Sequence, residues 1–161
     1  MSFFVKSTLA TRPKTKNVRP ISLGLAAVFI IMAVSQLFTF ESFPEVINAM
    51  GVPGSGDFAS VRAAIIVTLE VAAVPFLLGM RLSPAMRIVS MVSGWLAILI
   101  WFIDSLWINL LDVKPASNAL LGDTITTPVG WWSVFFCLGL GVLAIWSAWG
   151  MWPHVSTKHK K

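Results

Sequence analysis

Glu70 is the side chain of this sequence whose type and position most clearly indicate chemistry. It lies at the centre of the apolar stretch Val61–Met80, in which it is the sole acidic residue. A carboxylate at the middle of a bilayer is costly, so such residues face the protein interior, where burial favours the neutral carboxyl. We interpret Glu70 either as a proton-relay, quinone-binding or substrate-binding carboxyl, or as a hydrogen-bonded carboxyl that joins helices as packing glue. The sequence leaves both open.

Three further polar side chains, Gln36, Arg62 and Asp104, lie near the ends of apolar stretches that the charge pattern described below assigns to the outside. Arg62 precedes Glu70 by eight residues, which is about 12 Å along a helix. One hypothesis is therefore a substrate-binding pocket that contains all four residues and opens outward. The alternative is that Arg62 and Asp104 form a salt bridge that fixes the order of the helices. No residue is predicted to be catalytic.

Metal and haem ligands are scarce in the sequence. Cys137 is the single cysteine, and the two histidines, His154 and His159, lie near the C-terminus, outside the apolar stretches. Disulfides need two cysteines, and haem or structural metal sites need several suitable ligands. We therefore expect no cofactor that is bound covalently or through metal ligation. A quinone held near Glu70 is the one cofactor that the hypotheses include.

Pro75 and two small residues indicate how the helices carrying these groups pack. Proline inside a helix frees the carbonyl four residues before it, here that of Val71, and bends the helix close to Glu70. Ser90 and Gly94 are four residues apart, a spacing at which small side chains let two helices approach closely.

Four apolar stretches have the length of about 20 residues that a membrane-spanning helix needs. The chain is 57% apolar and 12% charged, with a mean hydropathy of +0.81, whereas a soluble domain is roughly 25% charged. We predict an all-α, integral membrane four-helix bundle. Its predicted spans are Ile21–Phe40, Val61–Met80, Met86–Ile108 and Trp131–Trp149.

Basic residues flank these spans unevenly and predict the orientation. Residues 1–20 are expected to form a disordered basic arm, residues 21–152 the transmembrane domain, and residues 153–161 a basic tail. The short turn Arg81–Ala85 is also basic. By the positive-inside rule, both termini are cytoplasmic. Because the basic residues flank apolar segments, we expect the lipid bilayer as partner and no nucleic acid. Between the first two spans, Phe43–Met50 is expected to form an amphipathic helix at the outer membrane interface.

The sequence resembles the DoxX/MauE-like family of small bacterial membrane proteins. The resemblance covers roughly Ile21–Trp107: a first span that leads into FTFESFPEVI, a Gly/Pro break, an acidic residue within TLEVAAVPFLLGMRL, a tight basic turn and a Trp-rich third span. It implies a four-helix bundle in the bacterial inner membrane, with Glu70 at the position of the family's central acidic residue. It also implies a role in quinone-linked or periplasmic redox systems. The chain departs from thiol-active proteins because it lacks a cysteine pair.

Three functions remain open from the sequence. The first is a non-catalytic membrane subunit or helper of a quinone-linked redox system, which works with a redox partner protein. The second is a small proton-coupled transporter or permease-like bundle, with Glu70 as the coupling carboxyl; a homo-oligomer would supply the paired repeats that transporters usually have. The third is a structural membrane protein without chemistry of its own.

The predicted orientation is testable by cysteine labelling in intact cells. A cysteine that replaces Ser55 should react with a membrane-impermeant maleimide, and one that replaces Ser156 should react only after the cells are lysed. Labelling at position 156 in intact cells would show that the orientation is the reverse of the predicted one.

Overall fold

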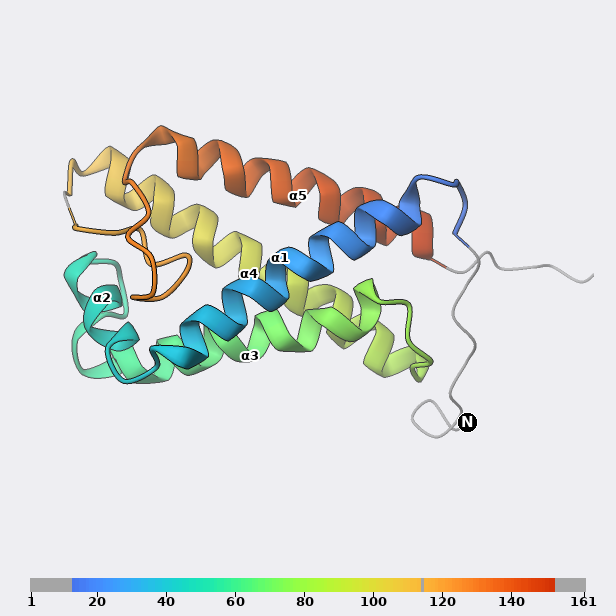
Figure 1. Cartoon of the computed structure of the whole chain (residues 1–161), viewed down its shortest axis with the longest axis horizontal. Helices are drawn as coiled ribbons and strands as arrows, with labels where there is room; N and C mark the ends of the chain where they lie inside the picture. The colour runs from blue at the N-terminus through green and yellow to red at the C-terminus, as the bar shows by residue number, and fades with distance from the viewer. Residues whose placement is uncertain (1–12, 114, 153–161) are drawn as a thin grey trace, which may run out of the picture.

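Four long helices make up the computed structural model, which describes residues 13–113 and 115–152 (Figure 1). They are α1 (Val18–Phe38), α3 (Ala59–Leu77), α4 (Pro84–Leu110) and α5 (Trp131–Met151). The short helix α2 (Phe43–Ala49) and the 3-10 turn η1 (Gly56–Phe58) connect α1 to α3. All four long helices are long and apolar enough to cross a membrane. The prediction of an all-α membrane bundle is confirmed, and the chain is a multi-pass membrane protein.

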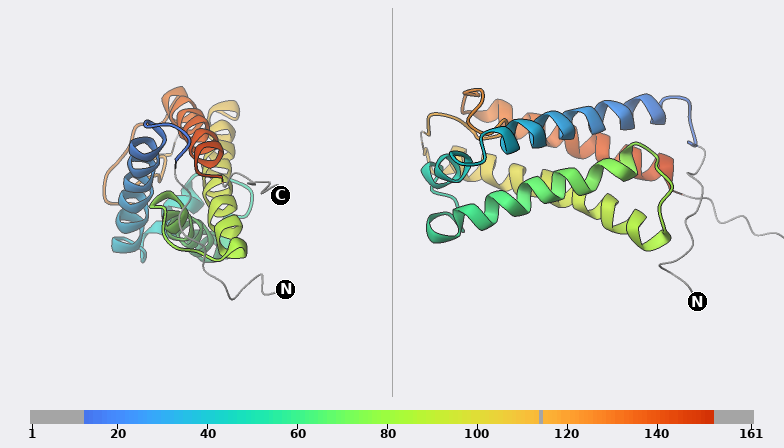
Figure 2. Two further views of the ribbon diagram at one scale, coloured as in Figure 1. Left: turned by 90° about the vertical axis from the view of Figure 1, so that its right-hand side faces the viewer. Right: turned by 60° about the horizontal axis from the view of Figure 1, so that its bottom comes forward.

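The bundle runs up and down, with its neighbours in the order α1, α3, α4, α5 and back to α1 (Figure 2). The first residues of α1 and the last of α5 lie at one end, where the backbone N–H of Lys14 donates to the carbonyl of Gly150 at 3.0 Å. We call this the basic end. The opposite end, formed by α2 and the loop 111–130, is called the loop end (Figure 1).

The helix boundaries differ from the predicted spans by a few residues. Helix α1 begins at Val18 rather than Ile21. Pro20 does not prevent this, because the first N–H groups of a helix have no intrahelical acceptor and proline is tolerated there. The predicted arm 1–20 is thus helical from Val18. Residues 1–12 and the predicted tail 153–161 lie outside the described residues.

The turn between α3 and α4 is tight, as predicted. Ser83 caps α4: its hydroxyl accepts a hydrogen bond from the backbone N–H of Met86 at 3.2 Å, and Pro84 is the first helical residue. Both features favour a helix start at this point. The turn fixes α3 and α4 side by side, so that residues of the two helices can meet at the bundle centre.

Pro75 interrupts the hydrogen-bond ladder of α3, and α4 repairs it. The N–H of Phe76, the residue after Pro75, donates to the hydroxyl of Ser90 on α4 at 3.0 Å. The same hydroxyl donates to the carbonyl of Ala72 at 2.5 Å, the acceptor that Phe76 would have in a regular helix. Gly94, one turn further along α4, allows the close contact: a Cβ added there would lie 3.2 Å from the Cβ of Ala73. Ser90 and Gly94 therefore serve packing, as their spacing predicts.

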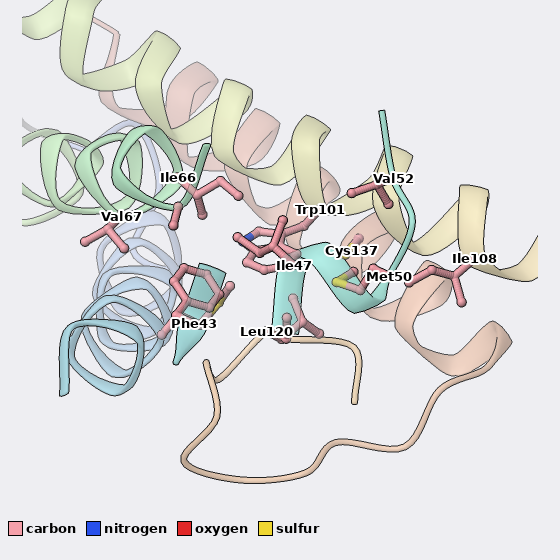
Figure 3. Close-up of a cluster of buried hydrophobic side chains, with 13 residues drawn as sticks. Phe43, Ile47, Met50, Val52, Ile66, Val67, Trp101, Ile108, Leu120 and Cys137 are labelled. Carbon is pink, nitrogen blue, oxygen red and sulfur yellow. The ribbon is translucent and has the colours of Figure 1, made fainter. Parts of the chain in front are cut away.

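The α2 helix forms where the sequence predicts an amphipathic helix, and its apolar face is buried by protein. Phe43 and Ile47 lie in the core together with Met50. They pack against Trp101 and Ile66 and close the loop end of the bundle (Figure 3). The apolar face of α2 is therefore covered by protein rather than by lipid. The ends of the four long helices spread apart here and leave apolar surface that a short helix can fill.

Replacing Ser90 by alanine should destabilise the bundle by about 1–3 kcal/mol, because the buried N–H of Phe76 loses its acceptor. The free energy of unfolding is measured by titration from mild detergent into SDS. In a Pro75→Ala background, Phe76 can donate to Ala72 as in a regular helix, so the same Ser90→Ala substitution should cost less. An equal cost in both backgrounds would show that Ser90 acts independently of the interrupted ladder.

Candidate functional site

Glu70 is completely buried and is held by side chains from two other helices. Its Oε1 accepts hydrogen bonds from the indole Nε1–H of Trp101 on α4 at 2.8 Å and from Nε2–H of Gln36 on α1 at 3.2 Å. Its Oε2 has no hydrogen-bond partner among the described residues. Glu70 thus faces the bundle interior, as predicted. One of its carboxyl oxygens connects α3 to α1 and α4, and the other makes no hydrogen bond to the described residues.

Gln36 connects the carboxyl to the loop end of the protein. Its Nε2 also donates to the backbone carbonyl of Leu120 at 3.1 Å, and its Oε1 has no partner among residues 13–113 and 115–152. The loop reaches this position because Gly122, with φ +61°, presses against α1: a Cβ there would lie 2.6 Å from Oγ1 of Thr39. Glycine is the residue that adopts this backbone conformation without strain.

Trp101 is the site residue that the sequence analysis missed. It is buried, with Ile66, Ile47 and Leu120 around it (Figure 3). Tryptophans near the ends of a span anchor it at the membrane interface, but Trp101 lies well inside α4. An indole N–H at that depth needs an acceptor inside the protein. Its position one turn before Asp104, on the same face of α4, could have indicated the contact.

Arg62 and Asp104 form an ion pair nearer the loop end. The Arg62 guanidinium also donates to the backbone carbonyl of Pro53 and so ties the loop before η1 to the bundle. The side chain of Asp104 is 3% exposed and that of Arg62 is 18% exposed. The structure therefore divides the four predicted site residues into two pairs, Gln36 with Glu70 and Arg62 with Asp104. Trp101 and Asp104 link the pairs through one face of α4.

The predicted outward opening is closed in this structure. Gln36 and Glu70 have no exposed surface and Asp104 is 2% exposed. Apolar residues of α2 and of the loop, among them Ile47 and Leu120, pack in one cluster with Trp101 (Figure 3). The connection between α1 and α3 and the connection between α4 and α5 each contribute side chains to the core.

A cavity of 190 Å³ lies near the site, and part of its wall belongs to the loop 115–130. It lies between α1 and α5, and its wall includes Met32, one turn before Gln36, and Leu120, whose carbonyl accepts from Gln36. Trp132 and Phe136 of α5 form the opposite wall. These walls are apolar, so the cavity suits a lipid-soluble molecule.

The fold and the site define a multi-pass four-helix membrane protein with a buried carboxyl at its centre. Comparisons with protein-family models, with curated proteins and with solved structures found no match. Within the described residues, no three His, Cys, Asp or Glu side chains lie close enough together to hold a metal ion.

The ion pair can be tested by a double-mutant cycle. Arg62→Gln and Asp104→Asn should each destabilise the bundle, because each leaves the partner's charge uncompensated in a largely buried position. The double variant should recover part of the loss, with a coupling free energy of about 1–3 kcal/mol in the SDS titration.

Arg81→Gln is the matched control, because Arg81 is an exposed cation in the turn before α4. Its effect should stay within about 0.5 kcal/mol, as for most surface substitutions. Strictly additive losses for Arg62 and Asp104 would show that the two side chains do not stabilise each other.

Proposed function

We propose that this chain is a DoxX-like membrane subunit or helper of a quinone-linked redox system, and that Glu70 holds the quinone head group. The observation that carries the proposal is the unequal use of the two Glu70 oxygens: Oε1 accepts two hydrogen bonds, whereas the equally buried Oε2 has no partner among the described residues. A buried polar atom without a partner is costly and calls for an explanation. A ligand that bonds to Oε2 supplies one.

The surroundings of Glu70 fit a quinone. A protonated carboxyl donates a hydrogen bond through its O–H, and a quinone carbonyl accepts one. Gln36 Oε1, also buried and without a partner among the described residues, can accept from a quinol hydroxyl. Gln36 lies one helical turn after Met32 in the wall of the 190 Å³ cavity and donates to the carbonyl of Leu120 in the same wall. Glu70 is connected to this wall through its hydrogen bond with Gln36. Apolar lining with few polar groups is typical of small-molecule sites.

Each residue then has a defined task. When bound, the quinone supplies two-electron, two-proton chemistry. Glu70 holds a proton at Oε2, and Trp101 keeps the carboxyl oriented by donating to Oε1. The apolar residues of α2 and of the loop exclude water from the carboxyl. The electrons come from a redox partner protein, so the chain acts as a subunit rather than as an autonomous enzyme.

We further propose that the chain lies in the bacterial inner membrane with both termini in the cytoplasm. The start of α1 and the end of α5 share the basic end, together with the turn that contains Arg81. Lys14, Lys16 and Arg19 add positive charge at this end, and such an excess favours the cytoplasmic side.

Quinone binding to the purified chain in nanodiscs tests the proposal. Decylubiquinone and menaquinone-4 are each titrated and the bound fraction is measured after separation. The wild type should bind one of them saturably. Glu70→Leu should weaken binding about tenfold, the effect of losing one hydrogen bond of roughly 1.4 kcal/mol. Glu70→Gln keeps a hydrogen-bond donor at the same place, so this variant should still bind the quinone. Its amide has no acidic proton, so it should not release a proton as the carboxyl can.

Glu45→Gln removes an exposed carboxyl from α2 and is the control; it should bind as the wild type does. Elution as a single species in detergent shows that each variant folds. If the wild type binds neither quinone, the redox proposal is wrong. If Glu70→Gln is then also as stable as the wild type, the role of Glu70 is to join helices.

A further inference from the structure

A long apolar groove runs along the membrane-facing side of the bundle between α4 and α5, away from Glu70. It consists of two cavities, of 620 Å³ and 420 Å³, which share Trp95 and Ile145 in their walls. The larger reaches Phe102 in the outer half of α4, and the smaller ends at Lys14. The groove therefore connects the middle of the membrane to the basic end.

Small residues on α5 form the floor of this groove. Gly141 and Ala144 line the larger cavity, and Ala148 lines the smaller one. A Cβ added at Gly141 would have one atom of Ile98 within 4 Å, at 3.9 Å, so the space above it is open. From Met91 to Phe102 the groove extends about 17 Å along α4 at 1.5 Å per residue. One leaflet of a hydrocarbon core about 30 Å thick has nearly this depth.

The basic end of the groove carries a cation in a defined position. The ammonium group of Lys14 lies 4.8 Å from the ring centroid of Trp149, and both residues line the smaller cavity. The sequence has no acidic residue before Glu41 or after Asp123, and none between Glu70 and Asp104. The one charged residue in the wall of the smaller cavity is thus a cation, Lys14, and an anionic ligand complements it.

We propose that this groove is a binding site for one anionic phospholipid, with an acyl chain between α4 and α5 and the phosphate at Lys14. Basic residues at the membrane surface attract anionic lipids, and Trp149 and Trp152 lie in the same wall at the depth where tryptophan meets head groups. A second copy in the same orientation would fit less well, because its own basic end would meet this one without any acidic residue to compensate.

Native mass spectrometry of the full-length protein tests the site. The protein is purified in detergent and supplied with phosphatidylglycerol or phosphatidylcholine. The wild type should retain one phosphatidylglycerol more tightly than phosphatidylcholine. Lys14→Gln should lower the affinity for phosphatidylglycerol about fivefold, the effect of one lysine near an anionic lipid surface. Lys16→Gln, an exposed residue of the same segment that does not line the groove, should change it much less.

A second pair of variants tests the groove itself. Gly141→Leu fills the floor and should abolish tight retention of both lipids. Gly139→Leu adds the same side chain to an exposed position of α5 outside the groove, where an added Cβ would contact no other helix. This variant should retain lipid as the wild type does.

Three results would overturn the proposal. The first is equal retention of the two lipids by the wild type. The second is an equal loss for Lys14→Gln and Lys16→Gln, which would indicate a diffuse charge effect. The third is a wild-type dimer that Gly141→Leu converts to monomers, which would show that a second copy occupies the groove. None of these measurements depends on quinone binding, so this proposal and the proposed function stand or fall separately.

Discussion

The absence of hydrogen-bond partners in the hydrocarbon core is the constraint on which this structure depends. Every polar group carried into the membrane must find its partner inside the protein. The carboxyl of Glu70 is held by Trp101 and Gln36, and the interrupted backbone of α3 is completed by Ser90. These bonds connect α3 to α1 and to α4. Because apolar side chains alone are no better paired with each other than with lipid, the polar bonds fix which helices are neighbours and at what height.

The same constraint makes the exceptions informative. Glu70 Oε2 and Gln36 Oε1 are buried without partners among the described residues, on side chains that are otherwise fully used. A buried polar atom without a partner is costly, so these two atoms call for an explanation. Both side chains are buried, and the cavity between α1 and α5 lies near them. These features support the proposal that a lipid-soluble ligand binds at Glu70.

Helix α5 borders both membrane-facing spaces. Trp132 and Phe136 line the cavity toward α1, and Gly141 and Ala144 line the groove toward α4. Its buried face consists mainly of small and apolar residues, so it packs by shape rather than through strong polar bonds. An anionic lipid in the groove and a quinone in the cavity would contact opposite sides of this helix.

The sequence by itself determined the number and approximate limits of the helices, because crossing a bilayer requires about 20 apolar residues and this is a local property. It also determined that Glu70 faces inward, since a carboxyl at mid-span is costly in lipid. It did not determine that Trp101 and Gln36 hold Glu70, or that Ile47 and Leu120 pack in one cluster with Trp101. Those contacts depend on how each helix is rotated about its axis and on where the connections fold back. Packing of all the helices together decides both, so only the tertiary structure could reveal them.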